Sequence, residues 1–376
     1  MIDYYPLNMS GRERIVSVDI IKGLAILSVI VFHTYSDCFP LYIDQILGRG
    51  WNVAVFFVVA GFFISEEDLD NPINFIKKKL KRLYIPAAII YALCVLLHNV
   101  FVSIGWYPLG EIHPGNGIPY DFYGIRDVLL RLLKVLFAGG SGELVMGAMW
   151  FLYSLLYAFI GIAFLNWIIR FFIKRKEIQF YLMTILLLIL AVISCILTHC
   201  YGYIVSRFST SLTAMFLIWW GMILNQKIRW NYDDIWFFII SLILFVQCIV
   251  LSQRVPVLAR NQYQDLLYLV VGSSSLVYIW GYLGNKIQLS LIGRFLSLLG
   301  RESLYLMAFH IFGFFICNSL LMWIGVFNTS EKKEMYTFAI GDNYLLLILY
   351  LIMAITVSLG IVFVWRYLRN IVSFVI

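Results

Sequence analysis

The sequence predicts an all-α protein: a polytopic bundle of about ten transmembrane helices, with both termini in the cytosol. Three observations support this prediction. Hydrophobic residues make up 62% of the 376 positions and charged residues only 13%, which is too little charge to cover a water-soluble domain. Apolar runs long enough to cross a bilayer recur from end to end. Lys and Arg gather in alternate connections between these runs.

The hydrophobic runs place the helices at about 15–37, 46–65, 83–104, 148–172, 178–199, 208–225, 234–252, 265–284, 303–326 and 344–367. With the N-terminus inside, nine of the 28 Lys and Arg residues fall outside and 28 − 9 = 19 fall inside. This bias agrees with the rule that cytosolic loops are rich in positive charge. We therefore expect one transmembrane domain over residues 1–376, with no appended soluble domain.

One connection is amphipathic. The segment YGIRDVLLRLLKVLF, residues 123–137, spaces its charges at helical intervals among leucines. It carries too much charge to span a membrane, so we expect it to lie flat on the outer interface. The six cysteines are scattered without CxxC pairs, and together with the histidines they show no metal-ligand spacing, so no metal is expected.

The first helix contains VDIIKGLAILSVIVFH, an apolar segment that carries Asp19, Lys22 and His33. At about 100° per residue, the eleven positions from Lys22 to His33 come within ~20° of three full turns. Asp19 and Lys22 are i,i+3 neighbours on the same face. Ionisable groups at this depth normally face a protein interior or a wet cavity. The alignment of these three side chains on one face therefore indicates a polar pathway across the membrane. The alternative is an ion pair that only fixes helix packing.

These residues resemble the opening signature of the acyltransferase-3 membrane proteins, in which an Arg, ten residues and a His occupy the first helix. Four further segments resemble family motifs in order along the chain: WNVAVFFVVAGFFIS (51–65), FIKKKLKRLYIP (75–86), MWFLYSLL (149–156) and RESLYLMAFHIFGF (301–314). The resemblance covers the whole length, and its specific parts are the first motif and the basic loop.

The sequence departs from the family at several points. Lys22 stands where most members carry Arg, which keeps the charge but loses the planar bidentate fork. The loop offers Lys78, Lys79, Lys81 and Arg82 in place of the usual paired arginines, and Ala148-Met149 replaces a His that often precedes the Trp-Phe-Leu motif. We expect no counterpart of the C-terminal esterase-like domain that some members carry.

The resemblance implies transfer of an acyl group, most often acetyl, from acetyl-CoA to a hydroxyl of a glycan or lipid-linked saccharide. His33 would act as the general base or accept the acyl group itself. Lys22, paired with Asp19, would stabilise the thioester oxygen or the phosphopantetheine end. The cations expected to contact the phosphates of the donor are Lys78, Lys79, Lys81 and Arg82. The same cluster would also serve any membrane protein as a positive-inside anchor.

Three residues are candidates for binding the acceptor: Glu143, Trp150 and His310. Their structural alternatives are a solvated loop acid, an interfacial aromatic residue and a satisfied intramembrane histidine. His98 reads as a helix-end residue. The expected partners are acyl-CoA, the saccharide acceptor and membrane lipids, with no nucleic acid, and the expected location is the bacterial cytoplasmic membrane.

Two other classes compete with the enzyme. A transporter or flippase for a lipid-linked sugar would use the polar stripe as a translocation path, but it predicts helices broken by Gly or Pro at the midplane. Most of the spans expected here are uninterrupted, with prolines in loops or at helix ends. A sensor or scaffold without chemistry would have no need for the aligned Asp19, Lys22 and His33. The sequence therefore favours the acyltransferase.

Overall fold

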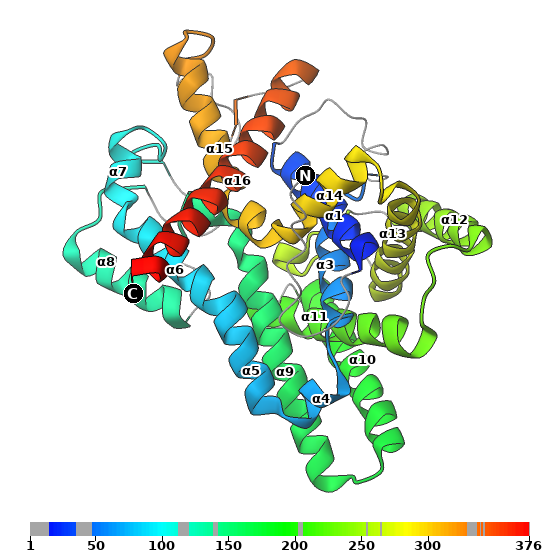
Figure 1. Cartoon of the computed structure of the whole chain (residues 1–376). Coiled ribbons are helices and arrows are strands. Elements are labelled where there is room, and N and C mark those ends of the chain that lie inside the picture. Colours follow the sequence, from blue (N-terminus) through cyan, green and yellow to red (C-terminus); the bar gives the residue numbers. More distant parts are fainter. Residues whose placement is uncertain are drawn as a thin grey trace.

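The computed structural model describes residues 15–34, 47–111, 120–137, 142–201, 206–252, 255–263, 265–328, 337–338, 340 and 343–375. Over these residues the regular structure is helical, apart from one isolated bridge between Val257 and Gln262. The prediction of an all-α bundle is confirmed. In Figure 1, α15 and α16 project from one end of the molecule, and the connection between α9 and α10 lies at the other.

Within the described residues, seven helices are long and apolar enough to cross a membrane. They are α1 (Val16–His33), α9 (Trp150–Phe172) with the preceding 3-10 turn η2 (Leu144–Met149), α10 (Lys176–Tyr201), α11 (Ser206–Ile223), α13 (Leu266–Ile287), α15 (Ser303–Trp323) and α16 (Tyr344–Val375). Each coincides with a predicted span.

The other three predicted spans are helical but shorter. They are α3 (Asn52–Gly61), α6 (Ile85–Leu96) followed by α7 (His98–Ser103), and α12 (Ile235–Leu251). At about 1.5 Å per residue, the 10 residues of α3 rise only ~15 Å. This is about half the thickness of a hydrocarbon core.

The membrane-spanning helices differ in how much of their surface other helices cover. In the apolar windows of α9 and α11, 72% of the residues are buried, but only 22% in α10 and 33% in α16. The exposed residues in the middle of α10 are nevertheless apolar, among them Ile185 and Ile189. Because such a surface is unfavourable in water, α10 and α16 form a lipid-facing rim around a core that contains α9 and α11.

The basic segment, Lys77–Arg82, lies in a helical run from Pro72 to Leu96, which follows a short separate helix. Ser65 and Asp68 form a capping box at α4 (Glu66–Asp70), and Asn71 accepts a hydrogen bond from the Asn74 N–H at α5 (Pro72–Lys79). Such caps satisfy backbone N–H groups that have no partner inside the helix. The run then passes through a π-helical turn, η1 (Leu80–Tyr84), into α6.

The sequence did not predict α14 (Leu291–Arg301), the helix that packs on α1. A Cβ atom on Gly23 would collide with the backbone oxygen of Leu296, and one on Gly300 with that of Asp19. The two helices therefore touch backbone to backbone, and both glycines are needed for this approach. The contact holds the Asp19 end of α1 in place.

Helix α8 (Ile125–Phe137) runs antiparallel to α6, and the flat interfacial position expected for it stays a prediction. At its first end Asn99 accepts a hydrogen bond from the Tyr123 N–H at 2.7 Å. At its last end the Tyr84 hydroxyl donates to the Leu136 carbonyl at 2.6 Å. Since Tyr84 and Asn99 lie near the two ends of the α6–α7 run, α8 follows that run along its length.

Candidate active site

The first helix presents an ion pair and a histidine. Lys22 Nζ lies 2.8 Å from Asp19 Oδ1, as the i,i+3 spacing predicted, and Asp19 is 5% exposed. His33 is the last residue of α1. The step of eleven positions from Lys22 to His33 corresponds to a rise of about 16 Å along the axis. The two side chains thus act at different depths of the bundle.

His33 meets His310, which comes from α15. The Nε2 atom of His310 lies 3.3 Å from Nδ1 of His33, and the ring centroids are 5.1 Å apart. His33 Nδ1 also lies 2.9 Å from the Val29 carbonyl, and His310 Nδ1 lies 2.8 Å from the Leu306 carbonyl. His310 is fully buried. The structure therefore brings together a predicted catalytic residue and a predicted acceptor-binding residue.

A cavity of about 230 Å³ opens between α1, α3, η1, α9 and α15. Its charged lining residues are Lys22, Lys79 and Arg82, and its other lining residues are Phe56, Val59, Ala60, Phe63, Leu83, Phe151, Leu152, Leu155, Phe159, Ser303, Leu304 and Met307. Among the described residues, three cations and no carboxylates thus border a space that is apolar apart from Ser303. We call it the cationic cavity.

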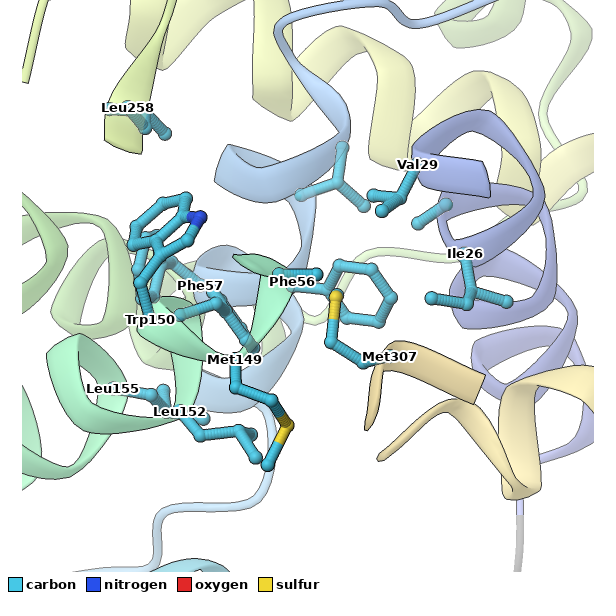
Figure 2. Close-up of a cluster of buried hydrophobic side chains, with 14 of the residues drawn as sticks. Ile26, Val29, Phe56, Phe57, Met149, Trp150, Leu152, Leu155, Leu258 and Met307 are labelled. Carbon is cyan, nitrogen blue, oxygen red and sulfur yellow. The ribbon is translucent and has the colours of Figure 1, made fainter. Parts of the chain in front are cut away.

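One end of the cationic cavity lies close to the histidine pair. Met307 lines the cavity and precedes His310 by three residues on α15, a rise of about 4.5 Å. Figure 2 shows Met307 beside Phe56, with Ile26 and Val29 of α1 close by. This apolar cluster lies one helical turn from His310.

The basic segment contributes to the cationic cavity unequally. Lys79 Nζ lies 3.9 Å from the centroid of the Phe159 ring, a cation–π contact. Burial lowers the pKa of Lys79 to about 8, with Arg82 and Lys78 lowering it further and Asp68 opposing them. Lys78 lies 3.4 Å from Asp68, and Lys81 is exposed. Two of the four predicted donor-binding cations, Lys79 and Arg82, therefore line the cavity.

A larger cavity of about 400 Å³ lies between α4, α9, α10 and α11. Its cations face carboxylates: Arg170 lies 2.7 Å from Asp70, and Lys227 lies 3.6 Å from Glu66. Lys176 and Glu177 complete a lining in which positive and negative charges balance. The cationic cavity is therefore the better site for a polyanion.

Glu143 is buried and takes part in a network that the sequence did not predict. Its carboxylate lies 2.9 Å from His98 Nδ1 and accepts a hydrogen bond from the Tyr123 hydroxyl at 3.1 Å. His98 Nε2 donates to the Asp121 carbonyl at 3.0 Å, and its ring stacks on Tyr123 at 3.4 Å. Burial, and then the Glu143 charge, raise the pKa of Tyr123. His98 and Glu143 are 45 residues apart, and no sequence signal links them.

Trp150, the third acceptor candidate, begins α9 and is 9% exposed. In Figure 2 its ring lies near Leu258, on the side of Phe57 away from Met307. Among the residues that the structure describes, no group of three or more His, Cys, Asp or Glu side chains is placed to hold a metal ion.

Apolar helices, a cationic cavity and a buried histidine pair define a membrane-embedded protein with a site suited to an anionic, partly apolar ligand. The family model for an acyltransferase domain matches residues 15–365, nearly the whole chain. The chain therefore belongs to the acyltransferase-3 family and is an integral-membrane acyltransferase. No curated protein and no solved structure matches it.

Proposed function

We propose that this acyltransferase transfers an acyl group, in the first place acetyl, from cytosolic acyl-CoA to a hydroxyl of an exported or envelope glycan or glycolipid, in the bacterial cytoplasmic membrane. The observation that carries the proposal is the cationic cavity. It joins Lys22 to Lys79 and Arg82 and ends at Met307, one turn from the histidine pair. The positive-inside bias assigns the basic segment to the cytosol, where acyl-CoA is made.

The charged residues of the cavity and the histidine beyond its other end would have different roles. Lys22, Lys79 and Arg82 would contact the phosphates of the donor. The sequence left two roles open for Lys22, the thioester oxygen and the phosphopantetheine end. Since Lys22 lies about 16 Å below His33 along α1, a reaction at His33 leaves Lys22 with the phosphopantetheine end. Asp19 holds Lys22 in place at 2.8 Å.

His33 then carries the chemistry by one of two balanced routes. As a general base it takes the proton of the acceptor hydroxyl while that oxygen attacks the thioester carbonyl, and the proton passes to the departing CoA thiolate. As a nucleophile it first takes the acyl group with release of CoA thiol, and the acceptor oxygen then takes the acyl group from the imidazole. Both routes give an ester and free CoA.

On the acceptor side we propose a role for the loop of residues 120–124, which precedes α8 and contains Tyr123, a partner of Glu143. Because Glu143 is 2% exposed and contacts His98 and Tyr123, it would act by shaping this loop. Trp150 remains a candidate for stacking on a sugar ring.

The test uses the full chain in nanodiscs, labelled acetyl-CoA and a chemically deacetylated envelope polysaccharide. Free CoA should appear together with label in the polysaccharide, and both should be lost in His33→Ala. Label transfer at the wild-type rate in His33→Ala would refute the role of His33. Movement of a lipid-linked sugar across vesicles without use of acetyl-CoA would favour the transporter alternative.

A further inference from the structure

The larger cavity, of about 400 Å³, lies at the depth of the lipid head groups. Two of its walls are α9, which ends at Phe172, and α10, which begins at Lys176. The connection between these helices lies at one end of the molecule (Figure 1). Because both helices are long and apolar enough to cross a membrane, their charged ends lie at the membrane surface. The cavity between them is therefore within reach of a lipid head group.

The lining of this cavity contains one cation and one carboxylate that are not used in its ion pairs. Its charged residues, three positive and three negative, are Arg170, Lys176, Lys227, Glu66, Asp70 and Glu177. Four of them form the two ion pairs described above, at 2.7 Å and 3.6 Å. Lys176 and Glu177 are exposed, and neither forms an ion pair with another of the described residues. The remaining charges are thus one positive and one negative.

Three amide side chains add hydrogen-bond acceptors to the same lining. They are Asn166, Gln179 and Gln226. The NH₂ group of each donates to a backbone carbonyl, at 3.0 Å for Asn166 and at 2.6 Å for Gln179. Because a carbonyl oxygen only accepts, the nitrogen of each amide must face the backbone, and the amide oxygen is the group that can accept a hydrogen bond from a ligand. The lining therefore suits a ligand that donates several hydrogens.

On the α10 side the cavity continues into an apolar surface. Tyr181 lines the cavity and is 66% exposed. At about 100° per residue, Ile185, Leu188 and Val192 follow Tyr181 to within ~40° on the same face of α10. All three are exposed and belong to the lipid-facing rim. An acyl chain that lies along this face places its head group at the cavity.

We propose that this cavity binds a zwitterionic phospholipid with a primary amine, that is, one with a phosphoethanolamine head group. The ammonium has three N–H donors, which match the Glu177 carboxylate and the amide oxygens. The phosphate matches Lys176 and the positive N-terminal end of α10. A phosphoglycerol head group has no cation for Glu177, and a choline head group has no N–H to donate. This site is separate from the cationic cavity and does not depend on the proposed transfer reaction.

The first test compares lipids. The full chain is delipidated in detergent, and native mass spectrometry measures its affinity for dioleoyl phospholipids. We expect phosphatidylethanolamine to bind about tenfold more tightly than phosphatidylcholine or phosphatidylglycerol, because the match of charges and N–H donors is lost in the other two. Equal affinities for the three lipids would overturn the proposal. Glycerophosphoethanolamine, the same head group without acyl chains, should compete only weakly. Competition as strong as that of the lipid would assign the cavity to a soluble amine.

The second test locates the site with matched variants. Glu177→Gln should lower the affinity for phosphatidylethanolamine about tenfold and remove its preference over phosphatidylglycerol. Glu67→Gln makes the same change of charge at an exposed residue of α4 that does not line the cavity, and it should bind as the wild type does. Lys176→Gln should weaken the binding of all three phospholipids, and Arg175→Gln, its exposed neighbour outside the lining, should not. Equal losses in a variant and its control would contradict a site in this cavity.

Discussion

Two histidines of the molecule, the buried His98 and the half-buried His33, have different partners. His98 uses both ring nitrogens, since Nδ1 faces the Glu143 carboxylate and Nε2 donates to the Asp121 carbonyl, and its ring stacks on Tyr123. His33 Nδ1 instead lies 2.9 Å from the Val29 carbonyl and 3.3 Å from Nε2 of His310.

The two histidines differ in the side chain that each ring contacts. A carboxylate beside an imidazole forms a charge-assisted pair that is costly to break once it is buried. A second imidazole accepts one hydrogen bond and adds no charge. Among the described contacts, His98 therefore lies beside a carboxylate, whereas His33 lies beside a second imidazole. Residue type alone does not distinguish structural from reactive histidines; the neighbours do.

The largest expected effect separates the two regions by activity. His33→Ala should lower kcat/KM for acetyl-CoA by about 10³-fold, because it removes the reacting atom, with little change in thermal stability. His98→Ala should keep turnover per folded molecule within about threefold. Both are measured as CoA release in nanodiscs, normalised to folded protein. Comparable losses of turnover in the two variants would break the comparison.

The next effect separates them by stability. Glu143→Gln removes the carboxylate that His98 contacts at 2.9 Å, and leaving a buried polar group without its partner costs about 1–3 kcal/mol. We expect a clearly lower melting temperature than for the wild type. The double variant His98→Gln with Glu143→Gln, which replaces both partners, should lose less than the sum of the two single variants. Simple additivity would show that the two side chains are not coupled.

The ion pair of α1, the long spans and the basic segment could be predicted from the sequence, because their signals are local. The Asp19–Lys22 pair follows from i,i+3 spacing, and the seven long spans follow from apolar runs of sufficient length. The sequence identified the basic segment as a cluster, but it did not show that only Lys79 and Arg82 of the four predicted cations line the cationic cavity. That selection depends on how α5 and η1 pack against α9 and α1, which no local pattern encodes.

The contacts between distant residues could not be predicted. His33 and His310 are 277 residues apart in the chain, and only the packing of α15 near α1 brings them together. Helix α14 was missed because its 11 residues include two glycines and two arginines, so its mean hydropathy falls below that of a span. The direction of α8 depends on hydroxyl bonds from Tyr84 and Tyr153 to its last carbonyls, and such bonds leave no periodic signature.

A smaller effect contrasts two neighbouring lysines. Lys78 is paired with Asp68, whereas burial lowers the pKa of Lys79 to about 8. Lys79 is therefore charged below pH 8 and loses its charge as the pH rises through that value. If Lys79 contacts a donor phosphate, KM for acetyl-CoA should rise about tenfold between about pH 7 and pH 9.5. Lys79→Arg keeps its charge and should flatten this rise, and Lys78→Arg should not. A persisting rise in Lys79→Arg would assign it to another group.

The smallest effect concerns the apolar end of the cationic cavity. Met307 lines this end and precedes His310 by one turn, so Met307→Ala should make room beside the reacting centre. Each added methylene that becomes buried is worth about 0.8 kcal/mol, or about fourfold. The ratio of kcat/KM for propionyl-CoA to that for acetyl-CoA should rise by about that factor. Met149→Ala is the matched control, since Met149 is equally buried in the same cluster (Figure 2) but does not line the cavity. An unchanged ratio in Met307→Ala would mean that the acyl group does not reach His33 past Met307, and the cavity would then lead elsewhere.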